Sequence, residues 1–278
     1  MHIGYLSNCF RPATIAEAVR QATENGFANL EVGPTVALER IAFTNVVTER
    51  KVTVGALIYC RNVLDKDPVR RQECRQALEA RIQLAGELKI PVVTTFTGKL
   101  VGASQEENDA AFLECFGPLC EKATSLGIKI AFENCFSDAN MASTPEEWRH
   151  VFSLLPSPAL GLCYDPSHAM RQLIDPYEPM KEFASRIAYV HAKDTELIRN
   201  RMNEGGIHGK GWWRFRLPGL GDLNWVRWLT RLRDVGYDGL LSIEHEDQHW
   251  VGSPEIVAAG LRFAKTYLEA CLDEVSRT

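Results

Sequence analysis

Short apolar segments of strand type alternate with longer segments of helical periodicity along the whole chain, and this alternation limits the possible folds more than any other feature. Each short segment has the length and composition expected of a buried strand. Eight such segments lie at residues 3–6, 29–32, 52–57, 92–96, 128–133, 160–165, 187–194 and 240–244. Strands that alternate with helices are typical of a parallel sheet, because each parallel connection needs a long crossover.

The segments between the strands carry signals for the ends of helices. Ser104 and Glu107 have the spacing of a capping box, which marks the start of a helix. A second start follows Ser253, because a proline and a glutamate come directly after it. The apolar pattern of this last helix predicts an inward face made of Ile256, Phe263 and Tyr267.

Eight strand and helix pairs in 278 residues predict a closed (β/α)8 barrel that forms a single domain, residues 1–278. An open doubly wound sheet is the alternative, but no Gly-x-Gly-x-x-Gly motif follows a strand to support a dinucleotide site. No linker of Pro, Gly and Ser divides the chain. The longest interruption, residues 194–221, is predicted to be a long loop after the seventh strand and a candidate lid.

Composition excludes several broad classes of partner. The net charge of −5 offers no general attraction for nucleic acid or for an anionic membrane. No apolar run approaches the roughly 20 residues that a membrane span needs. The amino terminus enters a strand at once, and the eight cysteines form no Cys-x-x-Cys pair, so we expect a cytoplasmic protein with reduced cysteines. A homo-oligomer is compatible with the sequence.

Ligand-type side chains occur at the carboxyl ends of the last four predicted strands. Glu133, Asp165 and Glu244 each end a strand, and His191 lies near the end of another. Neighbouring strands of a (β/α)8 barrel end on one face, so we expect these side chains to converge there. Each one alone has a simpler explanation as a surface charge or a hydrogen-bonded core group. Three acids at one pocket floor would repel each other without a cation, however.

The donor set predicts one divalent metal ion. Three carboxylates and one imidazole suit Mn2+, which we take as the first choice, and also Mg2+ or Co2+, with Zn2+ as a further possibility. The same donor set disfavours metals that prefer thiolate ligands.

Several short motifs surround these positions. They are Glu133-Asn134, Asp165-x-x-His168, His191-x-Lys193-Asp194, Gly219-x-Gly221-x-x-x-Trp225, Gly236-Tyr237-x-Gly239 and Ser242-Ile243-Glu244. Together they resemble the xylose isomerase-like TIM-barrel family of sugar isomerases and epimerases. The distribution of the ligands is similar to that in the tagatose 3-epimerase and inosose dehydratase branches. One position departs from the pattern, because Ala139 stands where some ketose epimerases carry a glutamate.

The resemblance implies roles for particular residues. It implies that Glu133, Asp165, His191 and Glu244 hold the metal ion, and that Glu133 and Glu244 also transfer protons. It further implies that His168 contacts the substrate.

The segment 194–221 contains further candidates for substrate contacts. We expect Trp212, Trp213 and Arg214 to bind the substrate, because tryptophan faces suit sugar rings and arginine suits a phosphate or a carboxylate. The alternative is a surface excursion whose two tryptophans pack on the barrel. Lys193 either contacts a substrate oxygen or pairs with Asp194. Glu31, at the end of the second strand, is equally compatible with a structural role and with a substrate contact.

These features predict a metal-dependent sugar isomerase or epimerase that acts on a small keto or aldo sugar. The metal would polarise the carbonyl, and two carboxylates would move a proton through an enediolate. A lyase or dehydratase acting on a 3-keto sugar or an inosose could use the same site. We expect a small sugar, and neither nucleic acid nor a membrane, as the partner.

Two other classes of function remain as alternatives. The family's apurinic-site nucleases need extra histidines for a cluster of several metal ions, and the presumed ends of strands three and four, Tyr59-Cys60 and Phe96-Thr97-Gly98, contain none. A barrel that only binds a sugar or a metal would also keep Asp165 and His191.

Overall fold

Eight parallel strands close into a barrel in the computed structural model, which describes residues 1–49 and 51–277. Around the barrel the order is β1, β10, β7, β6, β5, β4, β3, β2. The strands are β1 (His2–Leu6), β2 (Asn29–Val32), β3 (Thr53–Tyr59), β4 (Val92–Thr95), β5 (Lys129–Glu133), β6 (Leu160–Tyr164), β7 (Ile187–Ala192) and β10 (Leu240–Ile243). The predicted closed barrel is confirmed.

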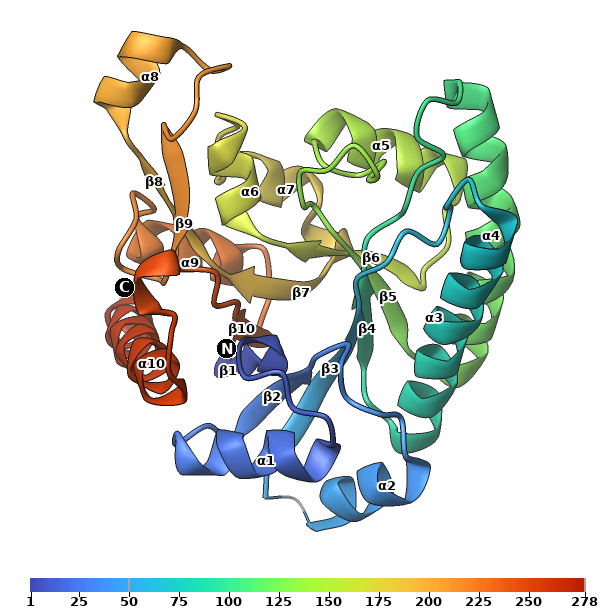
Figure 1. Ribbon diagram of the computed structural model, residues 1–278, viewed down its shortest axis with the longest axis horizontal. Coiled ribbons are helices and arrows are strands. Elements are labelled where there is room, and N and C mark those ends of the chain that lie inside the picture. Colours follow the sequence, from blue (N-terminus) through green and yellow to red (C-terminus); the bar gives the residue numbers. More distant parts are fainter. Residues whose placement is uncertain (50, 278) are drawn as a thin grey trace.

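Helices surround the barrel and cover the outer face of its strands (Figure 1). They are α1 (Ile15–Glu24), α2 (Arg40–Glu49), α3 (Pro68–Leu88), α4 (Gln105–Leu126), α5 (Pro145–Leu154), α6 (Pro166–Arg171), α7 (Pro179–Glu182), α8 (Arg199–Gly205), α9 (Trp225–Asp234) and α10 (Pro254–Ser276). Three short 3-10 turns are η1 (Ser7–Cys9), η2 (Ala184–Arg186) and η3 (Gln248–Trp250). Within residues 1–49 and 51–277, none of the helices combines the length and apolarity of a membrane span.

The predicted helix starts are confirmed, but the inward face of α10 is not. Ser104 and Glu107 form a full capping box on α4, and Ser253 caps α10. The side chains of α10 that are buried are Val257, Ala258, Leu261, Ala264, Leu268, Cys271 and Val275. Ile256 and Phe263 are 44% and 37% exposed, so the predicted face is wrong at these two positions, whereas Tyr267 is partly buried against the core. Apolar residues occupy both candidate stripes, and Phe263 stacks on Trp250 instead of entering the core.

Two apolar layers lie on the two sides of the barrel wall. A large layer fills the space between the strands and the helices. A small layer fills the interior of the barrel, where a close-packed core excludes water. Its members are Ala56, Val92, Ala131, Cys163, Tyr189 and Leu240. The interior is therefore filled, and chemistry is confined to the carboxyl ends of the strands.

Residues 194–221, predicted as a long loop after the seventh strand and a candidate lid, contain regular structure of their own. β8 (Asp194–Leu197) and β9 (Trp213–Arg216) form an antiparallel pair, and α8 lies between them. Figure 1 shows this hairpin and α8 projecting away from the barrel. The strands are only four residues long and rich in charge, which hides them from a search for apolar segments. We name this unit the β8–β9 hairpin.

Asp194 anchors the β8–β9 hairpin to the barrel. Its buried carboxylate accepts hydrogen bonds from the backbone amides of Thr195, Gly219 and Leu223 and from Trp225 Nε1. Gly221 passes so close to this carboxylate that a side chain there would collide with it. The Gly-x-Gly motif therefore has a physical cause, because the chain must wrap around Asp194.

Candidate functional site

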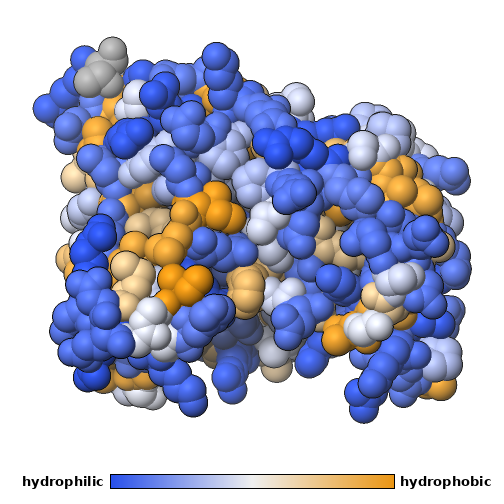
Figure 2. All heavy atoms as spheres, turned by 90° about the horizontal axis from the view of Figure 1, so that it is seen from above, coloured by the Kyte–Doolittle hydropathy of each residue, from blue (hydrophilic) through white to orange (hydrophobic). Residues whose placement is uncertain are grey.

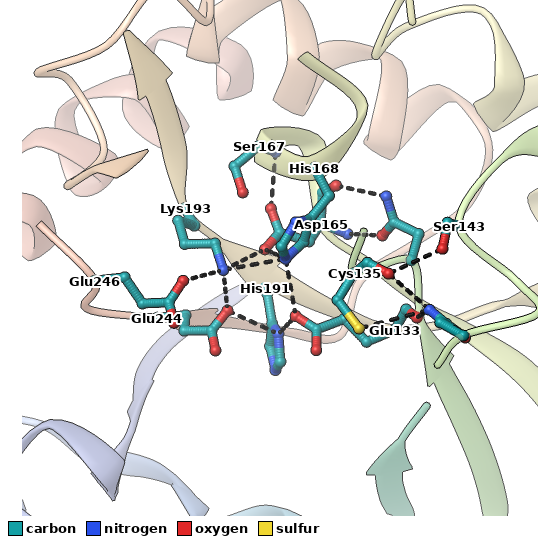
Figure 3. A network of polar contacts seen from close by, with 12 residues as sticks. Glu133, Cys135, Ser143, Asp165, Ser167, His168, His191, Lys193, Glu244 and Glu246 are labelled. Atoms are coloured by element: carbon teal, nitrogen blue, oxygen red, sulfur yellow. Dashed lines mark hydrogen bonds and ion pairs between the residues drawn. The ribbon is translucent and has the colours of Figure 1, made fainter. Parts of the chain in front are cut away.

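The carboxyl ends of β5, β6, β7 and β10 meet on one face of the barrel and gather the polar side chains of Figure 3. Glu133 ends β5, Asp165 follows β6, His191 lies in β7 and Glu244 follows β10. Ligand atoms of Glu133, Asp165, His168 and Glu244 all lie within 4.8 Å of one another. The structure therefore brings the acids of neighbouring strands into one buried cluster, which we name the carboxylate cluster.

Asn134 fixes the position of Asp165. Its side-chain amide donates to the Asp165 carbonyl over 2.9 Å and accepts from the Asp165 amide over 2.8 Å. The Asp165 carboxylate in turn caps α6 by accepting from the amide of Ser167. His168, in the first turn of α6, then lies with its Nε2 3.6 Å from Asp165 Oδ2. The Glu133-Asn134 and Asp165-x-x-His168 motifs are thus parts of one local arrangement.

His191 lies between two carboxylates. Its Nδ1 is 2.9 Å from Glu133 Oε1, and its Nε2 is 3.0 Å from Glu31 Oε2. Glu31 is fully buried and also accepts hydrogen bonds from the hydroxyls of Thr94 and Ser242. These contacts orient the imidazole, as carboxylates commonly do for histidines that bind metals. Glu31 is therefore a positioning residue for His191, a role that the sequence left open.

Charges inside the cluster shift its pKa values in opposite directions. Burial favours neutral Glu133, but His191, His168 and Lys193 outweigh it and hold the pKa of Glu133 well below its usual range. Burial likewise disfavours the imidazolium, but Cys163 and the carboxylates around the ring raise the pKa of His191 well above its ordinary value. The pKa of Glu244 is also lowered, because Lys193 overcomes the effect of burial. Both glutamates are therefore ionised at neutral pH.

Lys193 is a buried cation among carboxylates. Its Nζ lies 2.6 Å from Glu244 Oε2, 2.9 Å from Glu246 Oε2 and 3.1 Å from Asp165 Oδ2. Burial opposes its charge, but Asp165 and the three glutamates around it raise the pKa of Lys193 well above the ordinary value. The structure does not pair its ammonium with Asp194, whose carboxylate binds the hairpin instead. Lys193 therefore faces the carboxylate cluster.

The donor set of the cluster fits a divalent cation. Asp165 Oδ2 is buried and accepts no hydrogen bond, although Lys193 Nζ lies 3.1 Å away as an ion-pair partner. In and around the carboxylate cluster, the acidic side chains outnumber the one lysine and the two histidines. These acids are Glu31, Glu133, Asp165, Glu244 and Glu246. Oxygen donors with an imidazole suit the divalent ions that the sequence predicted.

The other predicted substrate residues lie outside the carboxylate cluster. Trp212 is buried and donates to the carbonyl of Ile207, so it packs within the hairpin. Arg214 forms a two-pronged ion pair with Glu196, with its nitrogens 2.7 and 3.0 Å from the carboxylate oxygens. Trp213 contacts Phe215, which in turn contacts His168. Of the three, only Trp213 is connected to the cluster through one intermediate ring.

Phe215 is a site residue that the sequence reasoning missed. Its ring lies 4.5 Å from Lys193 Nζ and 5.1 Å from the ring of His168. In β9 it pairs with Thr195, on the same face of the hairpin as Trp213. The alternation of Trp213, Arg214, Phe215 and Arg216 would have revealed this apolar face if the segment had been assigned to a strand.

Two cavities border this region. A cavity of about 260 Å3 reaches Glu244 and Glu246 from the segments after β1 and β10, where Asn8 and Arg11 line it. A second cavity of about 490 Å3 lies between α6 and the hairpin, with Arg171 and Trp213 in its wall. The first offers direct access to the acids for a small polar molecule.

Comparisons with curated proteins find both relatives with a named activity and uncharacterised relatives. The chain is 29% identical over 152 residues to an inosose dehydratase of Geobacillus kaustophilus. This match covers 52% of the chain but only 46% of the length of that dehydratase. The uncharacterised protein YfiH of Bacillus subtilis is 26% identical over 272 residues, with 86% of the chain and 83% of YfiH covered.

Comparisons of structure and of family agree with the barrel. The crystal structure of a D-tagatose 3-epimerase-like protein superposes with a TM-score of 0.76 at 20% identity, covering 100% of the chain and 99% of that protein. At this identity the similarity shows the fold alone. The family model described as a xylose isomerase-like TIM barrel matches residues 19–267, most of the chain. The chain therefore belongs to the xylose isomerase-like TIM barrel family.

Proposed function

We propose that the chain is a divalent-metal-dependent sugar isomerase or epimerase. The observation that carries this proposal is the pair of buried, ionised glutamates on either side of one imidazole nitrogen. His191 Nδ1 lies 2.9 Å from Glu133 Oε1 and 3.4 Å from Glu244 Oε2. Two carboxylates this close can remove a proton from one carbon of a bound sugar and return it to another carbon or another face.

The metal would be held by Glu133, Asp165 and Glu244 with an imidazole. When bound, such an ion supplies a Lewis acid that lowers the cost of removing a proton next to a carbonyl. One of Glu133 and Glu244, both ionised, would accept that proton and become a carboxylic acid. The proton would then return to another carbon or face either from that acid or from the other glutamate, after transfer between the two. Lys193 donates hydrogen bonds toward the developing negative oxygen, and Phe215 covers Lys193 against water.

A lyase or dehydratase is the second candidate, and the inosose dehydratase relatives favour it. Removal of the same proton can expel a substituent from the neighbouring carbon, so the residues that start the two reactions are shared. Product mass separates them. An isomerase leaves the mass unchanged, whereas a dehydratase product is lighter by one water.

Metal removal is expected to abolish proton exchange. The protein is stripped with a chelator and assayed on a panel of keto sugars and inososes for incorporation of solvent deuterium, with and without Mn2+, Mg2+, Co2+ or Zn2+. Exchange should fall to background without metal and return on its addition, with Mn2+ expected to be the most effective. The absence of metal-dependent exchange across the whole panel would count decisively against this function.

The choice of histidine ligand can be tested separately. The ligand atoms that cluster within 4.8 Å include His168, whereas both nitrogens of His191 contact carboxylates. If His191 is the ligand, as the family resemblance implies, His191→Ala should weaken Mn2+ affinity by at least about tenfold. His168→Ala should then retain the metal and raise KM for the sugar. The reverse result in a direct metal titration would assign the ligand role to His168.

Other parts of the sequence prediction remain proposals. We infer a small sugar as the substrate and a cytoplasmic location, and a homo-oligomer stays compatible with the sequence. The choice of Mn2+ over Mg2+, Co2+ and Zn2+ rests on the mixed carboxylate and imidazole donor set.

A further inference from the structure

Arg171, at the carboxyl end of α6, is held between two aromatic rings. Its guanidinium carbon lies 4.3 Å from the centre of the Phe136 ring and 4.2 Å from that of Trp213. Stacking covers the two flat faces of a guanidinium but leaves its N–H groups free, because they point outward in the plane. These two ring contacts therefore leave the guanidinium N–H groups available as hydrogen-bond donors.

No acidic side chain pairs with Arg171 among residues 1–49 and 51–277, in contrast to the neighbouring arginines of the hairpin. Arg214 binds Glu196, and Arg216 binds both Glu196 and Asp247. Arg171 is partly buried, and this desolvation lowers the pKa of its guanidinium. A guanidinium with free donors and reduced solvation is a ready partner for an anion.

The cavity beside Arg171 is large enough for part of a small ligand and contains no acid. It has a volume of about 490 Å3, within the range of small-molecule sites. Its wall includes Phe136, Arg171, Leu173, Ile207, His208 and Trp213. Phe136, Leu173 and Ile207 are about half exposed. Figure 2, which views the molecule from the side of α5, α6 and α8, shows apolar groups in patches on a mainly hydrophilic surface. We name this cavity the Arg171 pocket.

The Arg171 pocket is built by the segments that also supply the carboxylate cluster. Phe136 follows Glu133 after β5, Arg171 lies three residues after His168 on α6, and Trp213 belongs to the hairpin that begins beyond Lys193. A chain of contacts joins the two sites. Lys193 Nζ is 4.5 Å from the Phe215 ring, and that ring is 4.9 Å from the Trp213 ring, which covers Arg171. The Arg171 pocket and the carboxylate cluster are therefore neighbours, connected through the rings of Phe215 and Trp213.

We propose that the Arg171 pocket binds an oxyanion, a phosphate or a carboxylate, carried by the substrate at the end remote from its reacting carbon. This inference rests on the proposed function, because it names the class of sugar that the same site accepts. Arg171 supplies the two-pronged donor, and Phe136 and Trp213 hold it in place. The predicted arginine contact of the hairpin, Arg214, is already paired with Glu196, whereas no acidic side chain of the described residues pairs with Arg171.

Direct binding of simple anions tests the pocket without any assay of turnover. Inorganic phosphate and acetate are titrated into the metal-free protein and into Arg171→Met and Arg171→Lys. Methionine keeps the apolar stem between the rings but removes the charge, so affinity for the preferred anion should fall at least about tenfold. Lysine keeps the positive charge but lacks the two parallel N–H donors of a guanidinium, so its affinity for the anion should lie between those of the wild type and Arg171→Met.

Arg227→Met is the matched control, because Arg227 also stacks on an aromatic ring, that of Tyr177, at 4.0 Å. It should bind the anions as the wild type does. Circular dichroism checks that each variant is folded. If the wild type binds neither anion, or if Arg171→Met binds both as well as the wild type, the proposal is wrong.

Matched sugars then identify the anion. A phosphorylated sugar, a sugar acid and a neutral sugar are compared in the exchange assay with wild type and Arg171→Met. We expect KM to rise at least about tenfold for one anionic sugar and to stay unchanged for the neutral one. If anion binding depends on Arg171 but no sugar shows exchange, the proposed anion site is supported and the proposed isomerase function is contradicted. If exchange is faster with neutral sugars and is the same in Arg171→Met, the isomerase function is supported and the proposed anion site is contradicted.

Discussion

Replacing Glu244 by glutamine is expected to lower the rate of sugar deuterium exchange by at least about 100-fold at saturating Mn2+, the loss typical of a missing acid or base. Glutamine retains nearly the same volume but cannot accept a proton from carbon. Glu133→Gln should have an effect of the same size, because both glutamates are ionised and lie against the same nitrogen of His191. Metal affinity should also weaken in both variants, which is why saturating metal is required.

Several measurements separate lost catalysis from lost binding or folding. Mn2+ affinity is measured directly for each variant. Rates of deuterium exchange are then compared only at Mn2+ concentrations that saturate the metal site. Glu121→Gln, at an exposed position on α4, controls for the substitution itself and should exchange at the wild-type rate. If Glu133→Gln and Glu244→Gln both exchanged at that rate, these glutamates would not be the proton-transfer pair, and a binding function would explain the site better.

The sequence predicted the barrel because its strands are buried on both faces and therefore stand out as apolar segments. The convergence of Glu133, Asp165 and Glu244 followed from the barrel, since the carboxyl ends of its strands share one face. Asn134 and Gly221 could not be explained from the sequence. Their roles depend on partners 31 and 27 residues away, Asp165 and Asp194, that only the folded chain brings near.

The hairpin shows what the sequence pattern could not reveal. Its short strands carry charges on one face, and these charges pair across the strands, as Arg214 and Arg216 do with Glu196. Both arginines form ion pairs with acidic side chains of the same protein. A segment with many cationic residues can therefore have few that are available to bind a ligand. Arg171 drew no attention at the end of a short helix, although its aromatic sandwich leaves its donors unpaired. Which cation remains free depends on side-chain partners, and these are set by tertiary structure.

Asp194→Ala is expected to lower the free energy of unfolding by about 3 kcal/mol, because several buried donors lose their acceptor at once. The donors include the backbone amide of Leu223 and the indole of Trp225, which hold the hairpin and α9 to the barrel. Urea denaturation at pH 7 measures the change. Because the same contacts position Phe215 over Lys193, the variant should also expose the carboxylate cluster to water. A loss of less than about 1 kcal/mol would mean that water replaces the carboxylate.

The stability that Asp194 contributes should also depend on pH, and Asp194→Asn provides a non-titrating reference. Burial outweighs the hydrogen bonds and raises the pKa of Asp194 from 3.8 to about 6. A raised pKa means that the folded state holds the proton more tightly, so this contribution is complete below about pH 3.8 and is lost as the pH rises through about 6. The wild type should therefore lose about 1 kcal/mol relative to Asp194→Asn between about pH 5 and pH 7.5. Parallel urea titrations of the two proteins measure this difference, and a constant difference across that range would show that Asp194 stays ionised within its ring of donors.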